Sequence, residues 1–202
     1  KMYPVVIKSR DGLDLVCYIT VPRWLDNGNG IPLKPVPMVL NVHGGPNARD
    51  YWGYNPEVQF YATRGYGVIQ MDYRGSTGYG RKEMILANHQ MGKKMQEDKY
   101  DALMWANDQG YVDMDNVCIS GASYGGYAAM QAATKNPELF KCIIAYVGVY
   151  DLTSMDLRGL QWSELGMPME YIEKGDPRDP DDYKNLYENC LLYTSPSPRD
   201  RQ

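Results

Sequence analysis

The chain has 202 residues, which suits one α/β sheet domain of about 200 to 250 residues and excludes a second large domain. Hydrophobic residues make up 44% and charged residues 23%, which supplies a sizeable core and excludes disorder along the whole length. The net charge of −4, with no cluster of Lys and Arg, excludes the basic face that nucleic acid or an anionic membrane demands. No run approaches the roughly 18 apolar residues of a membrane span.

The two ends of the chain differ in character from its middle. The chain starts at Lys1 rather than Met, and a strand pattern begins almost at once, so we expect the natural N-terminus to lie upstream. Residues 190–202 change abruptly to a polar run with the composition of a disordered tail. The first eleven of them resemble the translated end of a transposon adapter used in sequencing libraries. We expect a domain over 1–189 and a non-native tail over 190–202, with a genuine polar tail as the alternative.

Hydrophobic patterning predicts a hairpin and then alternating strands and helices in the first half of the chain. Two apolar segments, 3–9 and 13–21, flank the turn-forming dipeptide Asp11-Gly12. Further elements are predicted as a buried strand over 36–42, a helix over 56–63 that begins at a first-turn proline, and a strand over 67–72.

The second half continues the alternation. We predict a helix over about 95–108 with Tyr100, Leu103, Met104 and Trp105 as its apolar members, a strand over 116–120, an Ala-rich helix over 124–135 and a strand over 141–147. Residues 151–189 read as a short helical cap. Repeated alternation of this kind predicts an α/β fold, with a mostly parallel sheet and helices on both faces.

Cysteine spacing gives no sign of a metal site or a disulfide framework. Outside the tail the chain has Cys17, Cys118 and Cys142, without a CxxC pair, and we expect them to be buried free thiols. We therefore expect no metal and no cofactor.

Residues 121–126 read Gly-Ala-Ser-Tyr-Gly-Gly and contain Gly-x-Ser-x-Gly around Ser123. A predicted strand precedes this motif and a predicted helix follows it, which is the context of a nucleophile elbow. Such a turn holds the serine in a strained conformation with its hydroxyl above the sheet. Ser123 is therefore the candidate nucleophile, and a Gly-rich helix start that only packs or binds phosphate is the alternative.

A second motif, His-Gly-Gly-Pro at 43–46, would serve the same chemistry. Acyl transfer at a serine needs backbone N–H donors for the developing oxyanion, one from the residue after the nucleophile and one from the loop after an earlier strand. The candidate donors are the N–H groups of Tyr124 and Gly45. For His43 we favour a structural role in orienting the loop over that of a general base.

The three segments 43–46 (HGGP), 72–80 (DYRGSTGYG) and 121–127 (GASYGGY) resemble, in order and spacing, the catalytic domain of the prolyl oligopeptidase family. Within the family the acylaminoacyl-peptidase and dipeptidyl-peptidase branches are the most similar, and residues 175–177 match a segment common there. The resemblance implies an α/β-hydrolase fold truncated at its C-terminal end, a β-propeller domain before it in the parent protein, and serine peptidase activity on short peptides.

The base of a catalytic triad is missing from this pattern. A serine nucleophile needs an imidazole and a carboxylate, which follow the serine in this fold, whereas His43 and His89 both precede Ser123. The resemblance places the triad Asp and His beyond residue 189, so we expect the chain to be inactive or nearly so. Asp151 is expected to be a structural cap residue, and His89 a solvated loop histidine.

Three functions remain open on the sequence. The first is a serine peptidase acting through an acyl-enzyme on Ser123, the second a carboxylesterase of the same fold, and the third a non-catalytic binding module. The expected partner is a short peptide substrate, with neither nucleic acid nor membrane, and we favour a cytoplasmic location.

Overall fold

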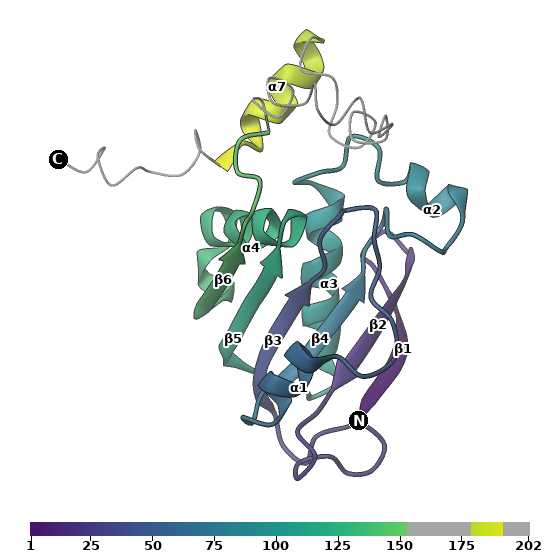
Figure 1. Cartoon of the computed structure of the whole chain (residues 1–202), viewed down its shortest axis with the longest axis vertical. Coiled ribbons are helices and arrows are strands. Elements are labelled where there is room, and N and C mark those ends of the chain that lie inside the picture. Colours follow the sequence, from purple (N-terminus) through teal and green to yellow (C-terminus); the bar gives the residue numbers. More distant parts are fainter. Residues whose placement is uncertain (153–178, 192–202) are drawn as a thin grey trace, which may run out of the picture.

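A computed structural model of the chain describes residues 1–152 and 179–191 (Figure 1). Most of the predicted cap, residues 153–178, and residues 192–202 of the predicted tail lie outside the described residues. Cys190 and Leu191 are buried, and the Leu191 N–H donates to the Tyr150 carbonyl oxygen at 2.9 Å, so these two residues pack with the domain. The domain boundary near 190 otherwise stays a prediction.

The elements alternate along the chain as the patterning predicts. In order they are β1 (Met2–Lys8), β2 (Asp14–Thr20), β3 (Val36–Val42), α1 (Pro56–Ala62), β4 (Gly67–Asp72), α2 (Arg81–Ile85), α3 (Lys94–Asp108), β5 (Val112–Ala122), α4 (Tyr124–Lys135), a 3₁₀ turn (Pro137–Leu139), β6 (Cys142–Tyr146) and α7 (Pro180–Glu188). Strand β5 is longer than predicted, and the short helix α2 was not predicted.

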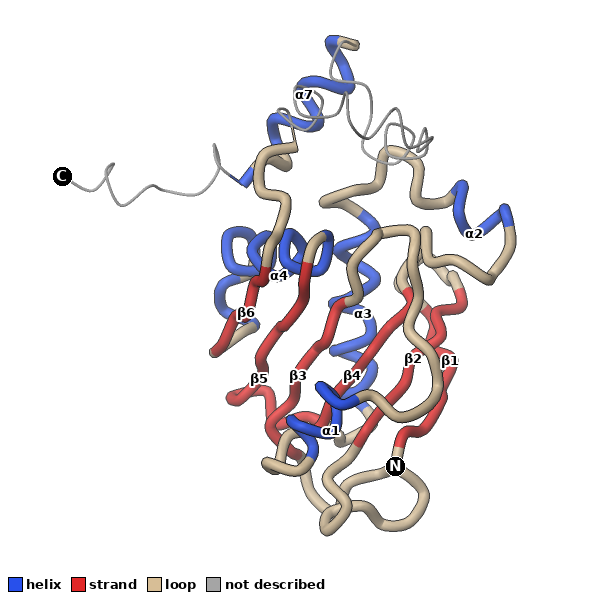
Figure 2. Tube along the Cα trace, in the orientation of Figure 1, coloured by secondary structure: helices blue, strands red, loops and turns tan. Residues whose placement is uncertain are grey.

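The strands form one six-stranded sheet in the order β1-β2-β4-β3-β5-β6. The β1–β2 and β2–β4 pairs are antiparallel, whereas β3 pairs in parallel with β4 and β5, and β5 in parallel with β6. Helix α1 lies on one face of this sheet and α3 and α4 on the other (Figure 2). The predicted α/β fold, with a mostly parallel sheet between helices, is confirmed.

Two apolar clusters fill the two sides of the sheet. The larger lies under α3 and α4 and includes Met38, Leu40, Ile119 and Tyr127, all at most 1% exposed. The smaller lies under α1 and consists of Val39, Val58, Val68 and Cys118. Because β3 and β5 run in parallel, the loops that follow them emerge at the same edge of the sheet, which brings the His-Gly-Gly-Pro segment to Ser123.

The cysteines follow the prediction in part. Cys17 and Cys118 are buried free thiols, whereas Cys142 is exposed. Cys142 begins β6, which pairs only with β5 among the described strands, so this end of the sheet leaves the Cys142 side chain uncovered.

Candidate active site

Ser123 occupies a sharp turn between β5 and α4. Its backbone has φ 56° and ψ −120°, a left-handed conformation that a side-chain-bearing residue rarely adopts. The turn is tied to the next strand because the Ser123 N–H donates to the Tyr146 carbonyl oxygen at 3.0 Å. Ser123 is exposed, while Gly121 before it and Tyr124 after it are buried. This is the strained strand-to-helix turn that a nucleophile elbow requires.

The glycines of the motif allow the helix to cross close to two strands. A Cβ atom on Gly121 would lie 2.5 Å from the Gly125 carbonyl carbon, and one on Gly125 would overlap the Val42 carbonyl oxygen. On Gly126 it would lie 2.7 Å from the Tyr146 carbonyl oxygen. Each contact is closer than real Cβ atoms allow, so the turn depends on glycine at these positions.

The His-Gly-Gly-Pro segment packs directly against the elbow. A Cβ atom on Gly44 would lie 3.0 Å from the Ala122 carbonyl oxygen and 3.3 Å from the Ser123 Cβ. Gly45 has φ +121°, which favours glycine. The segment that carries the Gly45 N–H and the helix start that carries the Tyr124 N–H therefore flank Ser123, as oxyanion donors must. Their assignment as donors stays a prediction.

The side chain of His43 is held among loop groups. Its Nδ1 donates to the Gly44 carbonyl oxygen at 2.8 Å, and its Nε2 lies 3.1 Å from the Ser76 hydroxyl. The ring stacks on Tyr73 with centroids 4.3 Å apart, and the Tyr73 hydroxyl donates to the His43 carbonyl oxygen at 3.0 Å. Burial lowers the pKa of His43 to about 4, so the ring is neutral at neutral pH. These contacts orient the loop.

His89 is likewise engaged elsewhere. Its Nδ1 lies 2.9 Å from the Asp182 carboxylate. This contact joins the segment before α3 to α7. Asp151 accepts a hydrogen bond from the Cys190 thiol at 3.4 Å. Among the described residues, the Ser123 hydroxyl makes no hydrogen bond to either histidine, and the sequence contains only these two.

Beside the elbow is an acidic group that no sequence motif singles out. Asp50 donates its N–H to Asp72 Oδ1 at 2.7 Å, and its Oδ1 accepts from Gln70 Nε2 at 2.6 Å. Burial, with the nearby carboxylate of Asp72, raises the pKa of Asp50 to about 7. Tyr79 donates to Asp72 Oδ2 at 2.5 Å. Two of these residues, Asp72 and Tyr79, belong to the 72–80 segment, which was the signal available in the sequence.

A hollow of about 460 Å³ opens next to these groups. Its lining includes His43, Gly44, Asp50, Ala122 and Tyr146. It has room for one or two side chains of a small peptide beside Ser123. In 1–152 and 179–191, no group of three or more His, Cys, Asp or Glu side chains is placed to hold a metal ion, and no helix is long and apolar enough to cross a membrane.

A mostly parallel sheet, a serine on a strained turn between strand and helix, and a glycine loop against that serine define an α/β-hydrolase. A sequence model of the prolyl oligopeptidase family matches residues 52–195, and the chain belongs to this family. The chain is 45% identical over 194 residues to dipeptidyl aminopeptidase BIII of Pseudoxanthomonas mexicana, covering 94% of this chain and 28% of that protein. It is 34% identical over 163 residues to dipeptidyl peptidase family member 6 of Caenorhabditis elegans, covering 73% of this chain and 22% of that protein.

Solved structures agree with this assignment. A puromycin-hydrolysing peptidase of Mycobacterium tuberculosis superimposes with a TM-score of 0.81 at 26% identity, over 96% of this chain and 28% of that one. An acylaminoacyl peptidase superimposes with a TM-score of 0.77 at 24% identity, over 96% of this chain and 30% of that one, and shows the shared fold. The chain thus spans between a fifth and a third of the length of the relatives it matches.

Proposed function

We propose that the protein hydrolyses peptide bonds of short peptides through an acyl-enzyme on Ser123. The observation that carries the proposal is the strained Ser123 turn, with the Gly44 backbone packed against the Ser123 side chain. The names of the relatives support peptides as the substrate class, since they include a dipeptidyl aminopeptidase and a dipeptidyl peptidase.

In the proposed reaction the Ser123 hydroxyl attacks the scissile carbonyl carbon, and the hydroxyl proton passes to a general base. The carbonyl oxygen becomes an oxyanion that accepts hydrogen bonds from the Tyr124 and Gly45 N–H groups. When the intermediate collapses, the amine takes a proton and leaves, and the acyl group stays on Ser123. Water then releases the acid by the same steps.

The proposal assigns the base to neither His43 nor His89. Burial keeps His43 neutral, its ring nitrogens contact Gly44 and Ser76, and His89 pairs with Asp182. A base must lie within hydrogen-bond reach of the proton it removes. We therefore expect the 202-residue chain by itself to react slowly, and we place the triad Asp and His of the whole protein beyond residue 189. A propeller domain before residue 1 belongs to the same proposal.

An ester substrate would undergo the same acyl chemistry, so the experiment must also test whether the protein is a carboxylesterase. The experiment compares turnover of a dipeptide anilide and a nitrophenyl ester by the whole protein, with Ser123→Ala as the control. Hydrolysis of both substrates, lost in Ser123→Ala, is expected for a peptidase. Hydrolysis of the ester alone would indicate an esterase, and turnover of neither would favour a binding module.

A further inference from the structure

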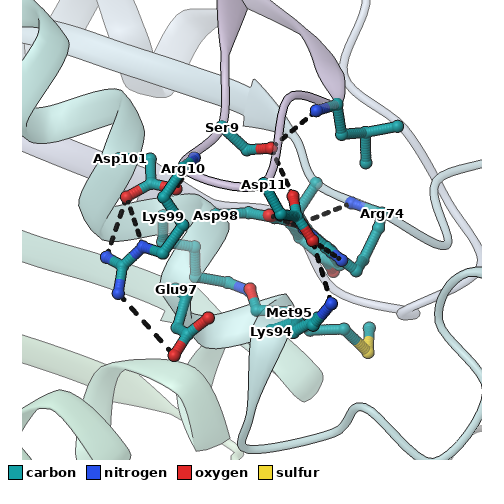
Figure 3. A network of polar contacts seen from close by, with 12 residues as sticks. Ser9, Arg10, Asp11, Arg74, Lys94, Met95, Glu97, Asp98, Lys99 and Asp101 are labelled. Atoms are coloured by element: carbon teal, nitrogen blue, oxygen red, sulfur yellow. Dashed lines mark hydrogen bonds and ion pairs between the residues drawn. The ribbon is translucent and has the colours of Figure 1, made fainter.

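Lys99 is a charged side chain buried completely inside the domain. It lies on α3, is 0% exposed, and its Nζ donates to the Met95 carbonyl oxygen at 2.5 Å (Figure 3). An ammonium group has three N–H donors. In the described part of the chain, Met95 is the one hydrogen-bond acceptor found for Lys99 Nζ. Hydrogen bonding alone therefore does not account for the burial of this charged group.

The adjacent carboxylate does not supply that explanation. Asp98 accepts from the Arg74 backbone N–H at 3.0 Å, from Arg74 Nε at 2.8 Å and from Arg74 Nη2 at 2.6 Å (Figure 3). The guanidinium group of Arg74 also donates to Asp11. The charge of Asp98 is thus matched by Arg74, and Lys99 points elsewhere.

Two tyrosine rings face the Lys99 amino group instead. The Nζ atom lies 3.7 Å from the centroid of the Tyr73 ring and 5.1 Å from that of Tyr124. The two ring centroids are 5.4 Å apart. A cation within about 6 Å of an aromatic face is attracted by its negative potential, most strongly where water is excluded. Lys99 therefore joins the two rings.

Tyr124 belongs to one of the two segments that flank Ser123, and Tyr73 packs on the other. Tyr124 directly follows Ser123 and carries one candidate oxyanion donor on its own backbone. Tyr73 stacks on His43 and donates its hydroxyl to the His43 carbonyl oxygen, two residues before Gly45, the other candidate donor. A displacement at Lys99 would reach both donors through one intermediate side chain each.

We propose that Lys99 is a positioning residue for acyl transfer at Ser123, and that its buried amino group holds Tyr73 and Tyr124 so that the Gly45 and Tyr124 N–H groups converge on the oxyanion. The inference rests on the proposed function of Ser123. It adds a residue that touches neither substrate nor nucleophile and acts through two aromatic rings.

The charge of Lys99 changes in the neutral pH range. Burial lowers its pKa to about 7, with Asp98 acting against the shift and Arg74 with it. The groups that face Lys99 are Asp98 on its own helix, Tyr73 and Arg74 after β4, Tyr124 on α4, and His43 after β3. His43 is neutral above about pH 4 and the pKa of Arg74 is raised, so neither changes charge near pH 7.

The test measures how fast a fluorophosphonate probe labels Ser123 of the 202-residue chain, with imidazole in the buffer as the base. Lys99→Met keeps most of the length of the side chain and removes the charge. Replacing a buried charge by an apolar side chain of similar volume is often neutral or stabilising, so this variant should fold. Lys94→Met is the matched control, because Lys94 lies on the same helix, is half exposed, and pairs with Asp11.

We expect Lys99→Met to be labelled about tenfold more slowly than wild type at about pH 6, since a misplaced oxyanion donor costs rate without costing the fold. The ratio of the two rates should fall towards one as the pH rises through about 7, where wild type loses the charge. A purely structural lysine would give no such pH-dependent ratio. Lys94→Met should stay within about twofold of wild type at both pH values.

Equal rates for wild type and Lys99→Met at about pH 6 would overturn the proposal, and so would a rate ratio independent of pH or loss of cooperative thermal unfolding in Lys99→Met. Absence of Ser123 labelling in wild type would overturn the proposed function itself, and the role of Lys99 with it. The two failures are therefore distinguishable.

Discussion

Gly125 lies so close to Val42 that a Cβ atom on Gly125 would overlap the Val42 carbonyl oxygen. This contact joins the first turn of α4 to the end of β3, the strand that leads into the His-Gly-Gly-Pro segment. It fixes where the helix begins, and hence where Ser123 stands above the sheet. The close approach explains why the elbow has glycine two residues after the nucleophile.

Gly125→Ala should therefore destabilise the domain strongly. The backbone oxygen of Val42 cannot move as a flexible side chain would, so we expect a loss of about 3 kcal/mol or more in the free energy of unfolding. Gly110→Ala is a suitable comparison, because Gly110 has φ +78° just after the end of α3 with open space around its Cβ position, and it should lose only about 1 kcal/mol. Urea denaturation measures both. Similar losses in the two variants would show that the Val42 contact does not matter.

Gly44→Ala should impair the chemistry more than the fold. The new methyl group would press on the Ala122 carbonyl oxygen at 3.0 Å and on the Ser123 Cβ at 3.3 Å, contacts that a small shift of the loop relieves. That shift moves the Gly45 N–H, and we expect the rate of Ser123 labelling by a fluorophosphonate to fall about tenfold. Gly110→Ala, at a glycine with no atom near its Cβ position, should leave the rate unchanged. An unchanged rate in Gly44→Ala would count against Gly45 as a donor.

The buried ion pair of Arg74 and Asp98 should contribute far more to the free energy of unfolding than the exposed ion pair of Arg10 and Asp101. Both carboxylates lie on α3. Asp98 is 0% exposed and takes three hydrogen bonds from Arg74, so Asp98→Asn leaves the buried guanidinium with only the more exposed carboxylate of Asp11 as its counter-charge. We expect a loss of about 3 kcal/mol in the free energy of unfolding. Asp101→Asn makes the same change opposite the half-exposed Arg10 and should lose about 1 kcal/mol or less. Equal losses would contradict the account of this network.

Asp50 should make the domain less stable as the pH rises through the acidic range. Its pKa is 3.8 when unperturbed and about 7 in the folded chain, so between these values the folded state binds more protons than the unfolded state. The free energy of unfolding therefore falls from about pH 4 to about pH 7 by the share due to Asp50. Asp50→Asn should remove that share, which chemical denaturation at several pH values measures. Glu138→Gln, an exposed change in the 3₁₀ turn after α4, should follow wild type. If the free energy of unfolding changed with pH in the same way in wild type and in Asp50→Asn, the raised pKa of Asp50 would be refuted.

Much of the fold was predictable because its strands are apolar runs and its helices have clear starts. The β3 segment 36–42 and the β4 segment 67–72 were predicted at their observed bounds, as was α4 over 124–135. The start of β5 was missed because Asp113 and Asp115 interrupt the apolar pattern. The helix α2 was missed because none of its five residues is buried, so no apolar periodicity marks it.

The network behind the site could not be predicted from periodicity. The α3 sequence shows Tyr100, Leu103 and Met104 as apolar members, yet Met104 is 42% exposed and Lys99 is fully buried. A charged residue within a helix is usually solvated. Lys99 has aromatic neighbours only because Tyr73, which follows β4, and Tyr124, on α4, pack beside it in the folded chain. The Ser123 turn, by contrast, could be predicted from the Gly-x-Ser-x-Gly motif, because the residues that cause the turn are neighbours in the sequence.

The most direct test of the account is the labelling of Ser123 in the 202-residue chain with and without imidazole. Neither histidine reaches the Ser123 hydroxyl, while the oxyanion donors are expected to be in place, so a small base in solution should supply what is missing. We predict slow labelling of Ser123 that imidazole accelerates, unchanged in His89→Gln and absent in Ser123→Ala. Rapid labelling without imidazole that is lost on changing His43 or His89 would contradict the account, as would labelling that imidazole fails to accelerate.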